Sequence, residues 1–327
     1  MISRIFQRPA STAASAATKR LVETFRETAK QAPVIIKRQV LDSNQLQRLS
    51  LTLNRPQLYQ DADVHNSRAP ANGTPVPPGY HLVYFTPAAL PEELGRDGTD
   101  ISYSPGAPFT RRMWAGGEIK WEKGNPLRIG DDATETTQLI SADPKVTRAG
   151  EDMIVVCVEK TFENAKGLAL IDKRDWVFRK TLSEPVPSQN GFVSIDPNNG
   201  LLPSSTSPQK SRDFMQTAVS LFRFSALTFN GHMIHYSRPW CRDVEGHREI
   251  VVHGPLNLIN MLDFWRDTQE DEYMLPKSIR YRATAPFYVG ENYRALMEQD
   301  GGTTSIKLWG HDGQGDVKLG MLGDILV

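Results

Sequence analysis

Two apolar runs in the second half of the chain contain one asparagine and three histidines that stand out: Asn230, His232, His235 and His253. Residues 221–236 read LFRFSALTFNGHMIHY, and residues 250–262 read IVVHGPLNLINML. The second run opens with His253, Gly254 and Pro255, and proline is tolerated in a first helical turn because its missing N–H would have no partner there. The pattern predicts a helix that begins here and is buried against a sheet by Leu256, Leu258, Ile259 and Leu262.

Helix and strand patterns alternate in the same order in both halves. A helix is expected at residues 43–53, and residues 77–85 could start another. Segments rich in Ile, Val, Thr and aromatic residues predict strands at 117–121, 136–142, 153–160 and 175–180, and again at 278–283, 288–298, 304–310 and 315–326. Helix first and antiparallel strands afterwards, twice over, predicts an α+β fold in which each sheet packs its apolar face on a helix.

A short echo supports an internal duplication. Residues 126–131 read PLRIGD and residues 286–291 read PFYVGE. Each segment follows a predicted strand and precedes a longer one, at matching positions in two halves of similar size.

Composition shifts divide the chain into four parts. Residues 1–32 are rich in Arg, Lys, Ser, Thr and Ala with no acid before Glu23, which is typical of a mitochondrial presequence. The alternative is the frayed basic N-terminus of a cytoplasmic protein. Residues 33–182 form a first globular unit, the Pro-, Ser- and Asn-rich residues 183–211 a linker, and residues 212–327 a second unit.

Charge and cysteine content exclude several classes of function. Lys plus Arg and Asp plus Glu both number 38, so there is no basic excess for nucleic-acid binding. Two cysteines cannot form a disulfide framework and indicate a reducing compartment. Cys157 reads as a buried inert thiol, and Cys241 has no neighbouring pattern that marks a role. Because no apolar run approaches ~18 residues, membrane insertion is not expected.

The first apolar run holds a candidate proton carrier. Asn230 and His235 are five residues apart with Gly231 between them, so the chain can turn and bring both side chains to one pocket. Imidazole acts as an acid or a base near neutral pH, and an amide can hold a water or hydroxyl without titrating. His232, His235 and His253 lack the spacing and the carboxylate or thiolate of a metal site, so we expect neither a metal nor another cofactor.

The predicted helix start could complete such a site. Free N–H groups and the positive end of the helix dipole attract a developing oxyanion. Gly254 would let a substrate carbonyl approach the backbone closely. The alternative is an ordinary buried helix with no role in chemistry.

Together these segments resemble the hot-dog hydratases and dehydratases of acyl thioesters, the MaoC-like superfamily. The resemblance rests on residues 224–235 (FSALTFNGHMIH) and on Val252, His253 and Gly254, and it is closest to the mitochondrial 3-hydroxyacyl-thioester dehydratases type 2 and mesaconyl-CoA hydratases. In the first half it rests on residues 112–117 (RMWAGG) and 126–131. The resemblance implies a double hot dog with a degenerate first half (33–182) and a catalytic second half (212–327).

The resemblance also implies a reaction and a set of roles. It implies reversible addition of water to enoyl thioesters, with acyl-CoA or an acyl carrier protein thioester as substrate. The aspartate of the wider superfamily is Asn230 here, so His235 is expected to relay the proton while Asn230 holds the oxygen. The Gly254 N–H would polarise the carbonyl. Thr228, His232 and His253 would support the substrate site, with a purely structural role as the alternative for each.

Several alternatives stay open at this stage. A hydratase of short dicarboxylic enoyl-CoAs, such as mesaconyl-CoA, would need an arginine in the pocket, and Arg223 and Arg238 flank the site. A hot dog that binds thioesters without turning them over is a further possibility. Arg280 and Arg282 could meet phosphates or form a solvated strand face. The resemblance leaves the mitochondrial matrix or the cytoplasm, and a monomer or a homodimer, as expectations.

Overall fold

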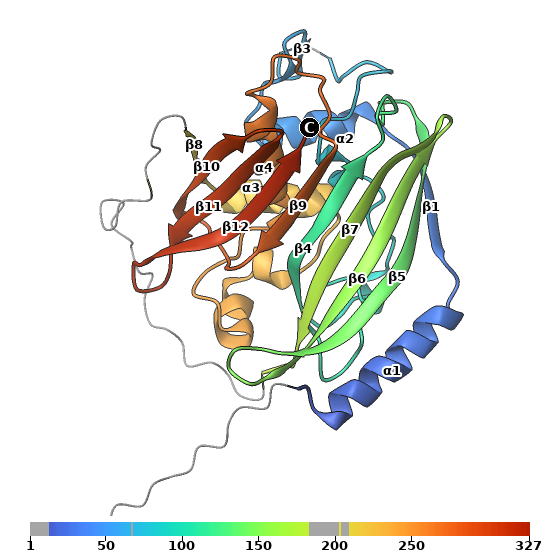
Figure 1. The fold of residues 1–327 in the computed structure, drawn as a ribbon, viewed down its shortest axis with the longest axis vertical. Helices are drawn as coiled ribbons and strands as arrows, with labels where there is room; N and C mark the ends of the chain where they lie inside the picture. The colour runs from blue at the N-terminus through green and yellow to red at the C-terminus, as the bar shows by residue number, and fades with distance from the viewer. Residues whose placement is uncertain (1–12, 67, 183–202, 204–208) are drawn as a thin grey trace, which may run out of the picture.

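The computed structural model of the chain describes residues 13–66, 68–182, 203 and 209–327. Ten strands form one antiparallel sheet in the order β1-β5-β6-β7-β4-β9-β12-β11-β10-β8 (Figure 1). The strands are β1 (Ile35–Val40), β4 (Arg111–Trp121), β5 (Asp132–Val146), β6 (Asp152–Asn164), β7 (Gly167–Arg179), β8 (Lys210–Met215), β9 (Ser278–Ala283), β10 (Asn292–Asp300), β11 (Thr303–His311) and β12 (Val317–Leu326).

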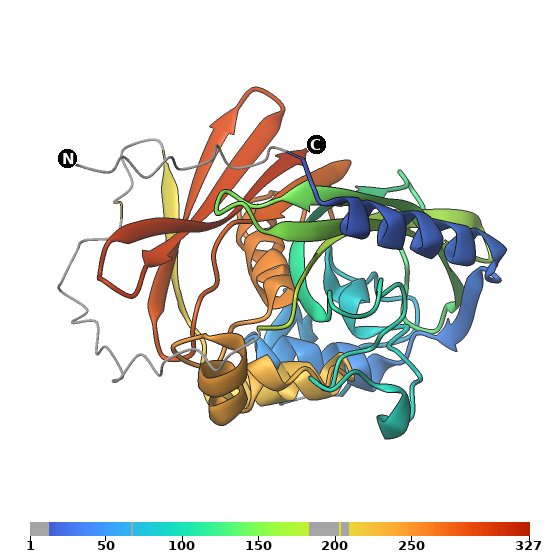
Figure 2. The ribbon, with the colours of Figure 1, turned by 90° about the horizontal axis from the view of Figure 1, so that it is seen from below.

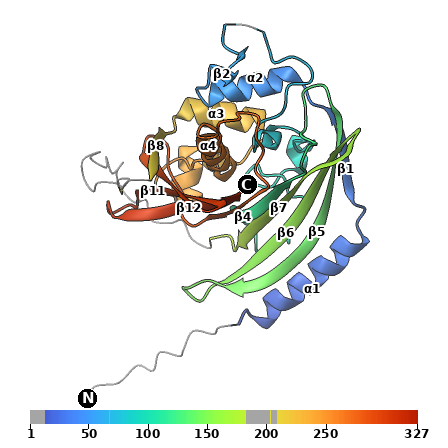
Figure 3. The ribbon, with the colours of Figure 1, turned by 45° about the horizontal axis from the view of Figure 1, so that its top comes forward.

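Four α-helices accompany this sheet in the described part of the chain: α1 (Ala16–Gln31), α2 (Ser43–Thr52), α3 (Ala218–Leu227) and α4 (Gly254–Arg266). Figure 3 shows α2 and α3 side by side, and Gln45 in α2 donates a hydrogen bond to the carbonyl of Leu227 at the end of α3. A small hairpin, β2 (Gln57–Tyr59) and β3 (Ala62–Asp63), follows α2. The double hot-dog class expected from the resemblance is confirmed.

The two halves join edge to edge through β4 and β9. Ile119 lies directly opposite Ile279 in this pairing, and both side chains are fully buried. The separation of 160 residues between these isoleucines is the same as that between Pro126 and Pro286 of the echoed segments. The Ile119–Ile279 pair therefore marks an approximate two-fold relation between the halves.

The echoed segments take the same path in both halves. Arg128 bridges Pro75, and Tyr288 bridges Val251. The glycine that follows has a positive φ each time, +87° at Gly130 and +80° at Gly290, a conformation that favours glycine. These glycines donate to the carbonyls of Leu41 and Gln216, the residues that follow β1 and β8. Matching hydrogen bonds support the internal duplication.

The interiors of the halves differ. In the C-terminal half α4 runs beneath the sheet (Figure 2), and every residue from Leu256 to Arg266 is buried. At the corresponding place in the N-terminal half, the predicted helix at residues 77–85 is only a short 3₁₀ turn, η1 (Tyr80–Val83). It ends before Phe85, which has φ of +54°, and Pro87 follows, so an α-helix cannot continue. A long central helix is thus present in one half only.

Most predicted elements are found with shifted ends. The helix at 43–53 is α2, and the strand at 278–283 is β9. The strand predicted at 288–298 begins only at Asn292, because residues 288–291 form the turn around Gly290. Of the predicted linker, residues 183–202 and 204–208 lie outside the described residues, and Lys210 and Ser211 already belong to β8.

Helix α1 lies in the predicted presequence and packs on the N-terminal half. Its Val22 is buried in a small apolar cluster with residues of β5, β6 and β7. Its N-cap Ser15 and the first-turn Thr18 both donate hydrogen bonds to the carboxylate of Asp152 on β6. Residues 1–12 of the predicted presequence lie outside the described part of the chain.

Candidate functional site

The end of helix α3 positions Asn230. Phe229 has φ of +48° and lies just past the helix, in the left-handed region that commonly ends helices but that usually takes glycine. The Asn230 N–H donates to the Ser225 carbonyl at 2.8 Å, which closes the helix end. A non-glycine residue in this conformation stores roughly 1–2 kcal/mol of strain, a feature that clusters at functional sites.

A tight loop follows, and the N-terminal half holds it. The side-chain Oδ1 of Asn230 accepts the His232 N–H at 3.1 Å, so the amide nitrogen of Asn230 is turned away from the backbone. The Met233 N–H donates to the carbonyl of Asp97 at 2.8 Å. Gly98 packs so closely on Gly231 that a Cβ there would lie 2.1 Å from the Gly231 carbonyl oxygen. Only glycine fits at this crossing.

His235 is held in one tautomer. It lies in a 3₁₀ turn, η3 (Met233–His235), and its Nδ1 is 2.8 Å from the carbonyl oxygen of Val251. Because a carbonyl can only accept, Nδ1 carries the proton and Nε2 has a free lone pair. Among the described residues, no group donates to Nε2, and the side chain lines the cavity described below.

Burial keeps His235 neutral. Desolvation lowers its pKa to about 4, against the opposing effect of the hydrogen bond to Val251. Its ring stacks on that of His253 with centroids 3.6 Å apart, an arrangement that disfavours a charge on either ring. The pKa of His232 and that of His253 are also lowered, first by burial and then by the neighbouring histidines. At neutral pH His235 is a base ready to accept a proton.

The start of α4 lies beside this histidine. His253 is the N-cap residue, and its Nε2 is 2.9 Å from the hydroxyl oxygen of Ser225. Gly254 is the first helical residue, with Pro255 after it. The indole of Trp114 on β4 covers Gly254, and a Cβ at Gly254 would lie 3.3 Å from the Trp114 ring. The start of α4 therefore presents backbone, without a side chain, to Trp114 of the other half.

Both halves line the cavity at this site. It has a volume of about 1720 Å³, and Asn230, His235 and Gly254 line it together with residues of β4, β5, β6 and β7. That volume exceeds the several hundred Å³ typical of a small-ligand pocket, so it has room for a thioester and part of its carrier arm. No group of three or more His, Cys, Asp or Glu in the described ranges is arranged to hold a metal ion.

The remaining predicted residues lie in different settings. Thr228 lines the cavity, but its hydroxyl donates to the Phe224 carbonyl and so caps α3. The His232 Nε2 is 3.5 Å from the carboxylate of Asp97. The site thus contains all six predicted residues, with His253 and Thr228 engaged in local structure.

The four predicted arginines are less central. Arg238 forms an ion pair with Glu249, and Arg280 pairs with Glu118 on a largely exposed face. Arg282 lines the cavity but is exposed. Arg223 is exposed on α3 and does not line the cavity.

Sequence reasoning missed the residues that come from outside the two apolar runs. Trp114 and Asp97 both touch the site and belong to the N-terminal half, whereas Ser225, which sequence reasoning also passed over, lies inside the first apolar run and contacts His253. Trp114 stood inside the recognised segment 112–117 and could have been flagged. The loop with Asp97 has no pattern that would place it there.

Comparisons with known proteins identify relatives of this chain. A family model described as hydroxyacyl-thioester dehydratase type 2 matches residues 79–289. The mesaconyl-C(4)-CoA hydratase of Chloroflexus aurantiacus is 30% identical over 76% of this chain and 83% of its own length. The mitochondrial hydroxyacyl-thioester dehydratase type 2 of Schizosaccharomyces pombe is 26% identical over 70% of this chain and 79% of its own.

Solved structures share the fold at low identity. A MaoC-like dehydratase from Phytophthora capsici superposes with a TM-score of 0.61, at 14% identity over 92% of this chain and 98% of its own. A Mycobacterium tuberculosis protein described as having a double hotdog fold gives 0.53, at 12% identity over 90% and 95%. In the part of the chain that the structure describes, no helix is long and apolar enough to cross a membrane.

Proposed function

The chain belongs to the hydroxyacyl-thioester dehydratase type 2 family and is a hydro-lyase, and from this premise we propose that His235, Asn230 and Gly254 form its active site. The proposed reaction is reversible addition of water across the C2–C3 double bond of an enoyl thioester. The observation that carries the proposal is the state of His235, which is neutral, fixed as the Nδ1–H tautomer and placed with Nε2 at the cavity.

In the hydration direction, Nε2 of His235 removes a proton from water as the oxygen bonds to C3. The electron pair of the double bond moves toward the thioester oxygen, which the N–H at the start of α4 stabilises; one such donor is typically worth ~3 kcal/mol. The His235 imidazolium then gives this proton to C2, which leaves His235 neutral again. Dehydration is the same path reversed.

Asn230 holds the reacting oxygen in this scheme. Its Oδ1 is occupied by the His232 N–H, so its amide N–H groups are the ones offered to a water or a 3-hydroxyl. His253 supports the ring of His235 by stacking, and His232 and Thr228 shape the loop around the substrate. The single titrating group of the mechanism is His235.

Two substrate classes follow from the relatives. The first is 3-hydroxyacyl thioesters, the substrate class in the names of the mitochondrial fungal relatives, and we propose that they are carried on CoA or an acyl carrier protein in mitochondrial fatty acid synthesis. The second is short dicarboxylic enoyl-CoAs, favoured by the likeness to the Chloroflexus mesaconyl-C(4)-CoA hydratase and by the arginines that line the cavity. A hot dog that only binds thioesters is the remaining alternative.

A panel of enoyl thioesters tests the proposal. The purified chain is offered crotonyl-, octenoyl- and mesaconyl-CoA and crotonyl carrier protein, and loss of the conjugated enoyl absorbance is followed. Hydration of at least one member is expected, and its identity selects the substrate class. Binding of every thioester with no turnover would leave only the non-catalytic alternative.

Location and assembly are further parts of the proposal. We propose the mitochondrial matrix, with the cytoplasm as the alternative. Because α1 is anchored through Ser15 and Val22, a cleaved leader would have to end before Ser15. Mass spectrometry of the mature N-terminus tests this, and a start after Gln31 would contradict it. The pairing of β4 with β9 inside one chain favours a monomer over a homodimer, which sedimentation measures.

A further inference from the structure

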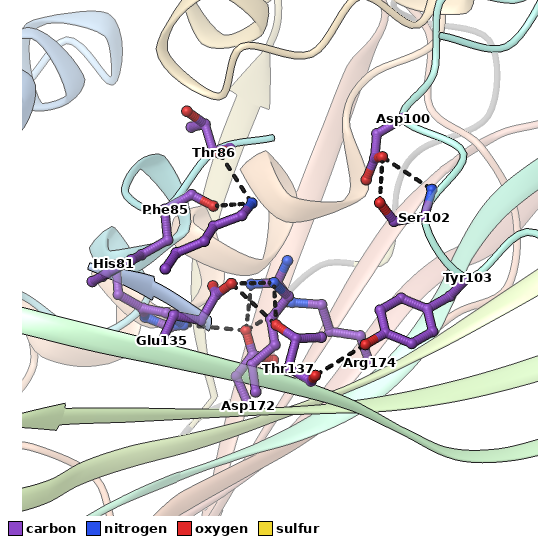
Figure 4. A network of polar contacts seen from close by, with 12 residues as sticks. His81, Phe85, Thr86, Asp100, Ser102, Tyr103, Glu135, Thr137, Asp172 and Arg174 are labelled. Carbon is purple, nitrogen blue, oxygen red and sulfur yellow. Dashed lines mark hydrogen bonds and ion pairs between the residues drawn. The ribbon is translucent and has the colours of Figure 1, made fainter. Parts of the chain in front are cut away.

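A belt of polar residues, most of them charged, crosses the inner face of the sheet in the N-terminal half, where a central helix is absent. It comprises Glu135 and Thr137 on β5, Lys160 on β6, and Asp172 and Arg174 on β7 (Figure 4). On each strand it lies between apolar side chains, for example between Val158 and Phe162 on β6. All of the belt except the underlying Asp172 lines the cavity. This surface is unlike the lining expected for a long hydrocarbon chain.

The charges of the belt are largely paired with one another. Lys160 contacts Glu135 at 2.9 Å, and Arg174 contacts Asp172 at 2.6 Å. Buried Asp172 is also 3.3 Å from His81. Burial raises the pKa of Asp172, but Arg174 and His81 outweigh this and lower it. The belt therefore needs no ligand to be stable.

Arg112 on β4 lies next to the belt and is not paired in this way. Strands β4 and β7 are neighbours, and the two arginines are arranged alike: Arg112 on β4 stacks on Trp176 of β7, and Arg174 on β7 stacks on Trp114 of β4. Unlike Arg174, Arg112 has no ion pair within the described residues, and its guanidinium donates only to the backbone carbonyl of Asp100 at 2.9 Å. Burial lowers the pKa of Arg112, and the nearby carboxylates of Asp100 and Asp97 offset this only in part.

The position of Arg112 places this cation close to the reaction. Alternate residues of a strand face the same side about 6–7 Å apart, so Arg112 lies one step from Trp114. Trp114 in turn covers Gly254, where the thioester carbonyl is proposed to bind. Both side chains line the cavity. The phosphates of a CoA or carrier arm are separated from the thioester by the whole pantetheine, whereas the far end of a four- or five-carbon acyl group is close to it.

We propose that Arg112 binds a carboxylate at the distal end of a short acyl group, and so selects dicarboxylic enoyl thioesters as substrates. The inference rests on the proposed function and deepens it. A guanidinium with open N–H groups matches the two oxygens of a carboxylate, and a partly desolvated setting strengthens the pair. The polar belt beside it suits a charged end and disfavours a long alkyl chain.

Binding of unreactive analogues tests the inference without turnover. Succinyl-CoA and butyryl-CoA are both saturated four-carbon thioesters and differ in the terminal carboxylate. Calorimetry of the wild-type chain is expected to show tighter binding of succinyl-CoA. In Arg112→Gln this preference should fall roughly 100-fold, as for other truncated buried charge pairs. Arg112→Lys keeps the charge but not the planar guanidinium, so its preference for succinyl-CoA should be intermediate between those of the wild type and Arg112→Gln.

Arg223→Gln is the matched control, because Arg223 is exposed on α3 and outside the cavity lining. It should keep the wild-type preference. Equal binding of the two analogues by the wild type, or an equal loss for both in Arg112→Gln, would overturn the inference; the latter would indicate a contact with the CoA part. Thermal unfolding checks that the variants fold. If Arg112→Gln does not fold, the same comparison is made with Arg112→Lys.

Hydration kinetics separate this inference from the proposed function. With crotonyl-CoA and mesaconyl-CoA, Arg112→Gln should lose kcat/KM for mesaconyl-CoA alone. If the wild type hydrates crotonyl-CoA but the variant shows no selective loss, only the inference fails. If the wild type hydrates no enoyl thioester while it still prefers succinyl-CoA, the proposed function fails and the carboxylate site stands.

Discussion

The two hot dogs of this chain share a backbone plan but differ in what fills them. Their β-turns around Gly130 and Gly290 and the hydrogen bonds of those glycines correspond one to one. The C-terminal half is filled by the buried helix α4, and the N-terminal half by a 3₁₀ turn, loops and a charged belt. The difference shows that the ladder of strands tolerates loss of a central helix when the neighbouring half supplies a core.

Each half contributes what the other lacks. The C-terminal half brings His235, Asn230 and the start of α4, and its own backbone holds the first two, through the Val251 carbonyl for His235 and the His232 N–H for Asn230. The N-terminal half brings open space, the covering indole of Trp114 and the loop at Asp97 that holds the turn containing His235. The comparison thus predicts chemistry in one half and substrate selection in the other.

The largest expected effect tests where the chemistry lies. His235→Ala should lower turnover of the best enoyl-CoA roughly 10³-fold, since general acid–base groups typically contribute that much. Buried His81, paired with Asp172 in the N-terminal half, is the matched control, and His81→Leu should leave turnover near the wild-type rate while lowering the melting temperature. Comparable losses in both variants would break the division between the halves.

The junction between the halves gives the next effect. Ile119→Ala and Ile279→Ala should each cost about 3 kcal/mol of unfolding free energy, because both side chains are fully buried. Their opposed positions predict nearly equal costs and a measurable coupling in the double variant. Urea unfolding gives these values. A clear inequality would show that the two-fold relation does not extend to packing.

Substitutions of Asn230 test whether its side chain positions the reacting oxygen. Asn230→Ala should lower kcat/KM roughly 30-fold, because the reacting oxygen loses a positioned donor. Asn230→Asp keeps an acceptor for the His232 N–H and should retain more activity than the alanine variant. A second ionisation in its pH profile would reveal a two-residue mechanism. Full activity of Asn230→Ala would remove this residue from the mechanism.

Acid should weaken the C-terminal half first. His235 has a pKa of about 4 in the fold against 6.5 when unfolded, as burial disfavours its charge, so the unfolded chain binds more protons between these values. Stability is therefore full above pH 6.5 and is lost as pH falls toward 4, by up to ~1.4 kcal/mol per unit for each such histidine. Hydrogen exchange at pH 7 and pH 5 should show α4 losing protection before β6 and β7; the reverse order would contradict this.

The smallest effect concerns the attachment of α1 to the N-terminal half. Burial raises the pKa of Asp152, but hydrogen bonds from Ser15 and Thr18 outweigh this and lower it to about 2. Asp152→Ala removes these bonds at the helix start and should cost about 1–2 kcal/mol. Limited proteolysis should then release residues near Ser15 faster, with no change in turnover. Unchanged proteolysis would show that the apolar contacts of Val22 and the Arg26–Asp143 ion pair are enough to hold the helix.

The sequence by itself determined the local features of this protein. Period-two strands, the Pro-Gly echo and the His253-Gly254-Pro255 helix start are encoded within a few residues, so residues 278–283 and the beginning of α4 were predictable. The same holds for His235 and Asn230, because Gly231 makes a tight turn between them possible. The family resemblance rested on these same short segments.

Only the tertiary structure decided which distant residues complete the site. Asp97, Trp114 and Arg112 are more than one hundred residues from Gly254 in the chain, and although Arg112 and Trp114 lie in the segment 112–117 that carries the resemblance, its pattern does not place them beside Gly254. The edge pairing of β4 with β9 places Arg112 and Trp114 beside the C-terminal half, and the hydrogen bond from the Met233 N–H to its carbonyl holds Asp97 there. The helix expected at residues 77–85 fails for a more local reason, because Phe85 has φ of +54° and Pro87 follows. Long-range packing, which no short pattern encodes, thus brought residues of both halves to one cavity.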